Sequence, residues 1–505
     1  MIIRTTHGDV KGFTRGDTAV FCGIPYGAPC DGAARFLPPR PAQDWEGVLD
    51  CTRNGPIAVQ NGGSISGSEG LGPYFSGGRP EDFGVKEERQ DEKCLVLNVL
   101  SPDVGGKKPV LVYIHGGGFA SGSGSLVVGA HRFVQEQDTV LVGVNHRLNV
   151  FGYLYLEHLD AKYAGSGMAG MLDLVLALEW VRDNIAAFGG DPAQVTVMGE
   201  SGGGAKINTL LAMPQAEGLF CRAVVESGSM PAGTLLPEQA AALTEKLAKR
   251  LGMEKPDPAA LAAVPAQQLL AAASDPALSF GPVADGANLA PNPAGSFAPQ
   301  GFACSIPLLV GSSEDEMAVF TPQEKLRDIT WENLAQKLAD SGPRRGMAGV
   351  KGFTEENAPA RIAVFRAADR KGDSPAHLYL KMVSMCGMLG GGAFHQAMAW
   401  AKSGAAPVYH YAVSYDAPLP DSGNMRCAWH TADLPLQLRV VLHPESEALS
   451  RRMAAALGAF VRSGSPATQE LPWPAFEPQQ RLTMVFDEEC RVESDPWQAL
   501  REQLS

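Results

Sequence analysis

Short apolar runs alternate along the chain with longer segments whose apolar residues recur at helical spacing. The segment 171–188, MLDLVLALEWVRDNIAAF, has a broad apolar face and is followed by Gly-Gly-Asp-Pro, so it predicts a helix that stops there. The short runs predict buried strands at 95–100, 109–114, 139–145, 195–198, 222–226, 306–311 and 407–415. Strands separated by segments long enough for crossover helices predict an α/β protein with a mostly parallel sheet.

Two further regions have helical patterns. Residues 236–275 are rich in Ala and Leu with prolines at the expected helix starts, and residues 323–404 are helical apart from the glycine-rich MCGMLGGGAF. Because we find no fixed-period repeat and no linker, we expect a single domain over 1–505, with helical insertions at about 231–300 and 321–404. The Gly- and Ser-rich stretch 61–84 predicts a long surface loop.

Composition and charge narrow the range of partners. The chain is 45% hydrophobic with a net charge of −13, which argues against a nucleic-acid partner. We see no apolar run long enough to span a bilayer and no signal-peptide pattern, so we expect no membrane association. The nine cysteines form no C-x-x-C pair, which argues against a zinc site or a disulfide framework and favours the cytoplasm.

One serine lies in a glycine cluster between an expected strand, VTVM, and an expected helix, AKINTLLA. The sequence around Ser201 is Gly-Glu-Ser-Gly-Gly, which matches the Gly-x-Ser-x-Gly nucleophile elbow, and no other serine matches it. Small flanking residues are needed there because the turn is so tight that larger side chains would collide. The pattern predicts a nucleophile; the alternative is a plain glycine-rich turn.

A second glycine cluster, HGGGF at 115–119, follows the expected strand PVLVYI. Backbone N–H groups of such a loop can form an oxyanion hole, which a serine nucleophile needs for its tetrahedral intermediate. A phosphate-binding loop is the alternative, but the Lys-Ser/Thr of a P-loop and the G-x-G-x-x-G spacing of a dinucleotide site are both missing.

Several long motifs resemble the type-B carboxylesterase and cholinesterase family of α/β-hydrolases, and they extend along essentially the whole chain. They are GIPYG at 23–27, RFLPP at 35–39, CLVLNV at 94–99, HGGGF at 115–119, NHRLNVFGYL at 145–154, NIAAFGGDPAQVTVMGESGGG at 184–204 and ESGS at 226–229. The resemblance implies a twisted, mostly parallel sheet flanked by helices, with an active site in a cleft between the core and helical insertions.

The resemblance also guides the choice of a catalytic acid, which follows the serine in the chain order of this fold. Relatives place it at the third position of the acidic run that here begins at Glu314, which selects Glu316. Asp315 is the alternative candidate for the acid. The whole acidic run could instead be an ordinary surface turn with no catalytic role.

Five histidines follow Glu316, at positions 377, 395, 410, 430 and 443. His410 lies inside an expected strand, whereas His430 lies in a loop-like segment. The family's histidine motif, His followed by an acidic residue and Leu-Pro, matches His430 through Pro435 and selects His430 as the base. The alternative is an ordinary surface-loop histidine.

These residues predict a mechanism without a metal or cofactor. Ser201 attacks an ester carbonyl, His430 takes its proton, and Glu316 orients the imidazole. N–H groups of Gly117, Gly118 and Gly202 receive the oxyanion. Because the base works only when neutral, we expect activity to fall below about pH 6 to 7.

The chain departs from the family in two places. Gly202 follows the nucleophile where most relatives have alanine, which leaves the backbone donor in place but makes it more flexible. Exported relatives pair the cysteine at the Cys94 position with one in a Gly-Pro-x-Cys stretch; here Ala58 stands at that position, so this pair cannot form.

Four further residues are candidates near the site. Glu200 and Ser227 occupy positions that tune the triad in the family, although each has a purely structural interpretation. Phe119 and Trp429 are candidate pocket walls, and core packing explains them equally well.

The leading functional hypothesis is a serine carboxylesterase that acts on small to medium uncharged esters, with a small molecule as its partner. The alternatives are a non-catalytic binding module on the same fold and a lipase, amidase or thioesterase that uses the same triad. The sequence leaves the oligomeric state open.

Overall fold

A computed structural model of the chain describes residues 1–61, 89–341 and 352–502, apart from residues 370, 372–373, 388, 405, 420–421, 423–424 and 442. The loop expected at 61–84 lies, from residue 62 onward, outside the described residues.

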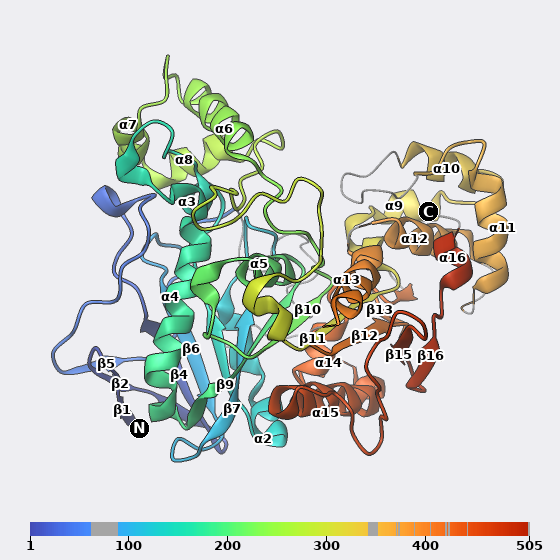
Figure 1. Cartoon of the computed structure of the whole chain (residues 1–505), viewed down its shortest axis with the longest axis horizontal. Coiled ribbons are helices and arrows are strands. Elements are labelled where there is room, and N and C mark those ends of the chain that lie inside the picture. The colour runs from blue at the N-terminus through green and yellow to red at the C-terminus, as the bar shows by residue number, and fades with distance from the viewer. Residues whose placement is uncertain are drawn as a thin grey trace.

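An 11-stranded sheet, counted over the described residues, forms the centre of the molecule (Figure 1). Its seven central strands are parallel, and antiparallel strands complete both edges. This confirms the predicted α/β fold with a mostly parallel sheet. In spatial order the strands are β16 (Arg491–Ser494), β15 (Leu482–Phe486), β12 (Val408–Val413), β11 (Leu308–Ser313), β10 (Arg222–Glu226), β9 (Gly190–Glu200), β7 (Lys108–Ile114), β8 (Val140–Val144), β6 (Val96–Ser101), β4 (Thr18–Pro25) and β3 (Phe13–Arg15).

The strands agree with the sequence prediction except at a few boundaries. All seven expected strands are present, but β9 begins at Gly190 and not at residue 195, because Gly190 already pairs with Lys108 before a register irregularity. Strands β15 and β16 were not predicted. Two small sheets lie outside the central one: β1 (Ile2–Arg4), β2 (Asp9–Lys11) and β5 (Val48–Asp50) form the first, and β13 (Ala417–Pro418) and β14 (Arg426–Cys427) form the second.

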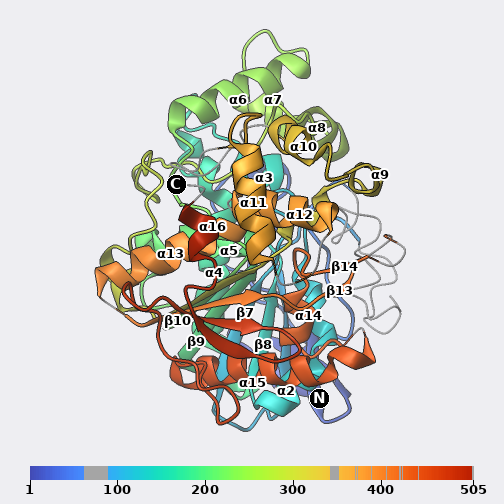
Figure 2. The same ribbon diagram turned by 90° about the vertical axis from the view of Figure 1, so that its right-hand side faces the viewer.

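Helices cover both faces of the sheet because successive side chains of a buried strand point to opposite faces. In β7, Val112 belongs to the core shared with α4 (Ala169–Asn184) and α5 (Gly202–Leu211), whereas Leu111 belongs to the core shared with α2 (His131–Gln137) and α15 (Glu447–Ser463). Figure 2 shows the sheet between α15 and α2 on one side and α4, α5 and α13 (Gly390–Ser403) on the other.

Helix α4 ends at Asn184, and the 3-10 helix η6 (Ile185–Phe188) continues it to the end of the predicted segment. By length and a mean hydropathy of 1.3, the segment Ala161–Phe188 could cross a membrane, whereas we expected no run of that length from the sequence. The most apolar 18-residue part of this segment is 78% buried inside the protein, as is typical of a core helix.

Two groups of helices lie where insertions were predicted, at the upper left and upper right of Figure 1. The prediction that proline starts helices is confirmed at α6 and α7, where proline occupies the first turn. The predicted interruption at MCGMLGGGAF is present but shorter, because α12 ends at Met385 and α13 already begins at Gly390. The assignment of the whole chain to one domain stays a prediction. The helices are α6 (Pro237–Arg250), α7 (Pro258–Ala263), α8 (Ala266–Ala273), α9 (Gln323–Arg327), α10 (Leu334–Asp340), α11 (Ala358–Ala368) and α12 (Pro375–Met385); α16 (Gln498–Glu502) lies beside the second group.

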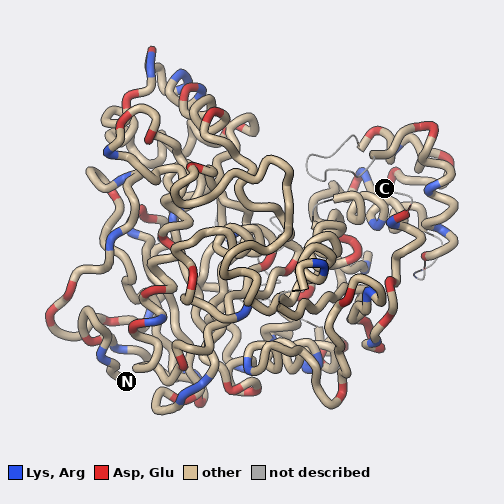
Figure 3. Tube along the Cα trace, in the orientation of Figure 1, with Lys and Arg blue, Asp and Glu red and all other residues tan. Residues whose placement is uncertain are grey.

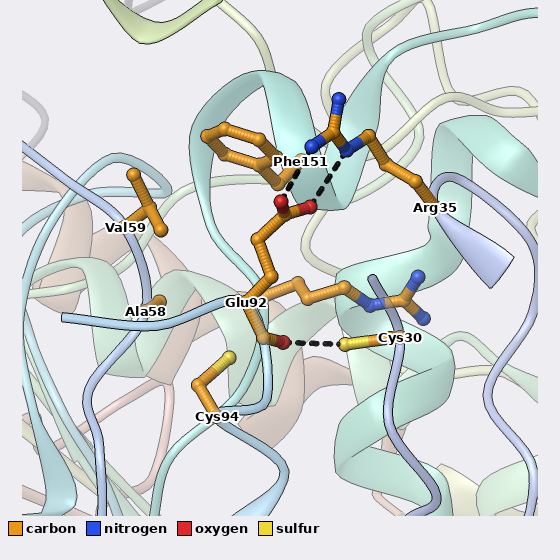
Figure 4. Close-up of a pocket in the computed structure, with 8 residues that line it drawn as sticks. Cys30, Arg35, Ala58, Val59, Glu92, Cys94 and Phe151 are labelled. Carbon is orange, nitrogen blue, oxygen red and sulfur yellow. Dashed lines mark hydrogen bonds and ion pairs between the residues drawn. The ribbon is translucent and has the colours of Figure 1, made fainter. Parts of the chain in front are cut away.

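The cysteines are free, including Cys94, whose family partner the sequence lacks. Ala58, which stands at the partner's position, lines the same small pocket as Cys94 and Cys30 (Figure 4). The Cys30 thiol donates to the backbone oxygen of Glu92 at 2.7 Å, and the Glu92 side chain forms an ion pair with Arg35. An ion pair and packed side chains therefore hold this region without a disulfide.

Charged residues of both signs are interspersed along the trace (Figure 3), and several ion pairs lie in the interior, among them Arg147 with Asp173. Arg147 and Asp173 have side chains that are 3% and 0% exposed, and two guanidinium nitrogens donate to the two carboxylate oxygens at 2.9 and 2.6 Å. Arg147 also donates to the backbone oxygen of Leu37 at 2.8 Å. This pair connects α4 to the segment that follows β8.

We expect Asp173→Ala to lower the free energy of unfolding by about 3 to 5 kcal/mol, because it leaves a buried guanidinium without its counter-charge. Chemical and thermal denaturation of the two proteins measure the change. The matched control is Asp183→Ala, which removes the exposed ion pair with Arg182 and is expected to cost less than about 1 kcal/mol. Equal losses in the two variants would contradict the assigned role.

Candidate active site

The order of the strands brings the predicted site residues to one edge of the sheet. Strand β7 lies beside β9, with Ile114 opposite Gly199, and β10 lies on the other side of β9, with Glu226 opposite Glu200. Loops that follow neighbouring parallel strands meet at the carboxyl edge, which is where ligands bind in open α/β sheets. The glycine loop after β7, Ser201 after β9 and Glu316 after β11 therefore lie on the same edge.

Ser201 lies at the turn between β9 and α5 with φ 55° and ψ −122°. This is a strained conformation for a residue with a side chain, and Ser201 N donates to Glu226 O at 2.7 Å to hold it. The neighbouring glycines are required by space: a Cβ on Gly199 would overlap the Gly203 backbone, and one on Gly203 would overlap Ile114 O. The predicted tight elbow is thus present, and the Ser201 side chain is partly exposed.

The glycine loop after β7 packs directly on this elbow. Gly117 and Gly118 have positive φ values of 81° and 61° and are exposed. A Cβ added to Gly116 would lie 3.4 Å from Ser201 Cβ, and one added to Gly202 would overlap the backbone nitrogen of Gly118. The three glycines predicted as oxyanion donors, at 117, 118 and 202, therefore lie together around the serine.

Glu316 is buried and contacts His430 Nδ1 through its Oε2 atom. Its other oxygen, Oε1, accepts hydrogen bonds from Ser227 Oγ at 2.6 Å and from the backbone N–H of Ser313 at 2.8 Å. These two donors hold the carboxylate so that Oε2 faces the imidazole. Ser227, which has a positive φ of 47°, thus contacts the predicted acid and not the predicted nucleophile.

The rival carboxylate Asp315 points away from His430. Asp315 Oδ2 lies 3.0 Å from His377 Nε2 and accepts from the backbone N–H of Ala428 at 3.0 Å. Burial opposes ionisation of Asp315, but Lys371 and His377 outweigh it and hold the pKa of this carboxyl well below its usual range.

Asp315, His377 and Asp416 bring ligand atoms within 4.8 Å of one another, which is the spacing of a metal site. The ammonium of Lys371 lies among them, 2.6 Å from Asp416 Oδ1 and 3.6 Å from Asp315 Oδ2. A cation of the protein therefore already balances these carboxylates, and the group is an ion-pair network behind Glu316.

His430 is buried, with its second nitrogen facing the elbow. His430 Nε2 lies 3.2 Å from Glu200 Oε1, and Glu200 immediately precedes Ser201. Burial lowers the pKa of His430, but the carboxylates of Glu200 and Glu316 outweigh burial and raise the pKa to about 9. The competing His410 lies inside β12, where its Nδ1 atom is 2.9 Å from Thr483 Oγ1.

Glu200 belongs to a group of buried acids around the imidazole. Burial raises the pKa of Glu200 to about 7, although His430 opposes the shift, and Thr431 Oγ1 donates to its Oε1 atom at 2.7 Å. Asp433 accepts from Tyr411 OH at 2.8 Å; burial and Glu316 raise its pKa to about 6. The site therefore holds buried acidic groups whose pKa values lie above their ordinary range.

The two predicted pocket walls have different environments. Trp429 is 2% exposed, and its indole N–H donates to Pro418 O at 3.1 Å, so it is a core residue. Phe119 is partly buried and packs edge-on against Tyr153, with ring centroids 5.3 Å apart. Its N-terminal neighbour in the chain is Gly118, so Phe119 remains beside the elbow.

Three residues at the site were missed from the sequence. Phe320 is 55% exposed with its ring centroid 5.2 Å from that of His430. Thr431 is the partner of Glu200 described above, and no sequence signal distinguished either residue. The third, Lys206, is fully buried in α5, and its isolated charge in an apolar helix was a signal that could have been used.

Comparisons with known proteins identify the family of the chain. The model of the carboxylesterase family matches residues 1–500. The chain is 32% identical to the para-nitrobenzyl esterase of Bacillus subtilis (strain 168), over 100% of this chain and 98% of that protein. It is 30% identical to the phenmedipham hydrolase of Pseudarthrobacter oxydans, over 97% and 95% of the two chains.

A solved structure of a Geobacillus stearothermophilus carboxylesterase superimposes with a TM-score of 0.81 at 32% identity, covering 100% of both chains. Sequence family and fold therefore lead to the same assignment. The chain belongs to the carboxylesterase family of enzymes and has the α/β-hydrolase fold.

Proposed function

We propose that the protein is a serine carboxylesterase with Ser201, His430 and Glu316 as its triad. The observation that carries the proposal is the pair of contacts made by His430. Its Nδ1 atom meets Glu316, while Nε2 faces the elbow that presents Ser201. A serine hydroxyl is activated when an acid holds one nitrogen of an imidazole and the other nitrogen takes the hydroxyl proton. Here the second nitrogen lies beside Glu200, the residue that precedes Ser201.

The proposed reaction has two halves. Ser201 Oγ attacks the ester carbonyl carbon while His430 Nε2 takes its proton, and N–H groups of Gly117, Gly118 and Gly202 bind the oxyanion. The protonated imidazole then gives its proton to the departing alkoxide, which leaves as the alcohol. Water repeats the sequence on the acyl-enzyme and releases the acid. This route requires no metal or cofactor.

In this proposal Ser227 contacts the acid of the triad and Glu200 contacts its histidine. Ser227 fixes the Glu316 carboxylate through the 2.6 Å hydrogen bond to Oε1. Glu200, 3.2 Å from His430 Nε2, favours the imidazolium that forms when Ser201 loses its proton. Both are positioning residues because neither touches the ester.

We propose small to medium uncharged esters as the substrates. Exposed Phe320 and partly buried Phe119 give the site apolar surface. The acidic groups of Glu200 and Asp433 disfavour an additional anion. The para-nitrobenzyl esterase and the other relatives are likewise named for hydrolysis.

A location in the cytoplasm and a one-domain organisation complete the proposal. Free cysteines are typical of a reducing compartment and support the first. One sheet that extends from β3 to β16, and so joins both ends of the chain, supports the second.

We expect Ser201→Ala to lower kcat for p-nitrophenyl esters, acetate through octanoate, by at least about 10⁴-fold, because the acyl group has no acceptor. Stopped-flow release of nitrophenol measures the burst and the turnover. Ser305→Ala is the control, since Ser305 is exposed just before β11, at the opposite end of the strand from the site. Turnover that persists in folded Ser201→Ala would refute the nucleophile, and an inactive wild type would favour a binding module.

The acid limb of kcat/KM is expected above pH 6.5, the ordinary histidine value, because protonated His430 cannot act as base and its pKa is raised. This moves the limb upward from the pH 6 to 7 expected from the sequence. We predict that Glu200→Gln, which removes one of the charges that raise this pKa, shifts the midpoint to lower pH by about one unit. Exposed Glu217→Gln serves as the control. An unshifted midpoint in Glu200→Gln would disprove the coupling.

The close contact at Gly202 yields a prediction in which the family's usual residue is harmful. We expect Gly202→Ala to lower kcat by about 10- to 100-fold, because the new Cβ displaces Gly118 and misplaces an oxyanion donor. Steady-state kinetics test this. Gly105→Ala is the control, since the nearest atom to its Cβ is 3.5 Å away. Wild-type kcat in Gly202→Ala would mean that the loop tolerates the shift.

A further inference from the structure

Helix α5 carries a buried lysine that the proposed mechanism does not use. Lys206 is 0% exposed, five residues beyond Ser201, in a helix whose residues are all buried. Lysine is almost never fully buried unless it is paired with an acid. Lys206 makes no ion pair within the described residues, and its one hydrogen bond there is from Nζ to the backbone oxygen of His115, at 2.9 Å.

This hydrogen bond is made to the start of the glycine loop. His115 directly precedes Gly116, Gly117 and Gly118, and its carbonyl is the last backbone oxygen before them. The same ammonium lies 5.7 Å from the ring centroid of Phe119, which directly follows the loop. One cation therefore contacts both ends of the segment that would supply two oxyanion donors.

Both contacts depend on the positive charge. A hydrogen bond from an ammonium is roughly twice as strong as one from a neutral donor, and a cation near an aromatic ring is attracted by its quadrupole. Burial lowers the pKa of Lys206 to about 7, and Glu200 opposes that shift. An anion forming in the loop would favour the protonated form, because an opposite charge nearby stabilises it.

The groups around Lys206 leave its charge largely unbalanced. Burial and Lys206 itself lower the pKa of His115 to about 3, and they also lower the pKa of His146, whose ring stacks on His115 at 4.9 Å. Both imidazoles are therefore neutral. Glu200 is the acid that influences Lys206, and its Oε2 atom lies 2.8 Å from the place that a Cβ on Gly116 would take.

We propose that Lys206 is a positioning residue for the oxyanion hole: its ammonium holds the His115 carbonyl and the Phe119 ring so that Gly117 and Gly118 keep their N–H groups directed at the tetrahedral intermediate. The proposal rests on the proposed esterase function. It assigns a role in transition-state binding to a side chain that touches no reacting atom. A lysine that merely filled the core would be replaceable by an apolar side chain of the same length.

The decisive variant is Lys206→Met, which keeps the length and removes the charge. We expect kcat for p-nitrophenyl butyrate to fall by about 10- to 100-fold while KM changes less than about twofold, because the loss affects the transition state and not substrate binding. We expect the inhibition constant of a trifluoromethyl ketone, which forms a tetrahedral anion on the serine, to rise by a similar factor. Lys206→Arg, which keeps the charge, is expected to retain more kcat than Lys206→Met.

Thr209→Val is the matched control. Thr209 is buried in the same helix, and its hydroxyl donates within that helix, to Ala205 O at 2.9 Å, so we expect an unchanged kcat. A fluorophosphonate that labels Ser201 counts the active sites in each preparation. If Lys206→Met does not fold, Lys206→Gln replaces it with the same expected direction.

The outcomes are distinguishable. A wild-type kcat and ketone affinity in the uncharged variant, with an active wild type, would overturn the role of Lys206 alone. A folded wild type that neither hydrolyses the ester nor reacts with the fluorophosphonate would overturn the proposed function and this role with it. Parallel losses in kcat and ketone affinity, with KM maintained and partial rescue by arginine, would support the proposal.

Discussion

The tight turn between β9 and α5 is the constraint on which the rest of the site depends. It places Ser201 at φ 55°, a conformation that costs energy and persists only where the surroundings enforce it. The Glu226 carbonyl holds the serine N–H, and the glycines at 199 and 203 leave no room for a Cβ. Because Gly202 touches Gly118, the same turn also sets the position of the glycine loop. One strained residue thus orders two loops that come from different strands.

Electrostatics in a buried volume is the second organising factor. His430 lies between Glu316 and Glu200, and the two carboxylates together outweigh the burial that would otherwise keep the imidazole neutral. Behind Glu316, the network of Asp315, His377 and Lys371 anchors the adjacent backbone to α12 and the segment before it. The predicted acid Glu316 therefore lies next to charge pairs whose partners come from the segment at 371–381 as well as from the sheet.

Most of the fold could be predicted from sequence because it depends on local patterns. Consecutive apolar residues marked the seven buried strands, and Gly-x-Ser-x-Gly marked the turn. The short strands β15 and β16 were missed, since neither has a long apolar run: β15 is five residues long with a threonine in it, and the edge strand β16 is Arg-Val-Glu-Ser. Ser201, Glu316 and His430 were selected by motif and family resemblance, but nothing in the sequence separated Glu316 from Asp315 by environment. That separation appears only when the backbone turns one carboxylate to His430 and the other to His377.

The sequence by itself determined the class of the protein: the strand and helix order, the elbow, the glycine loop and the family. These follow from residue types at short spacing, where sterics and hydrophobic periodicity act locally. Only the tertiary structure decided which residues distant in the sequence contact one another at the site. It brought Phe320 against His430, Thr431 against Glu200, and Lys206 beneath the His115 carbonyl. Such contacts join residues tens to hundreds of positions apart, and their energies depend on burial, which exists only after the layers have packed.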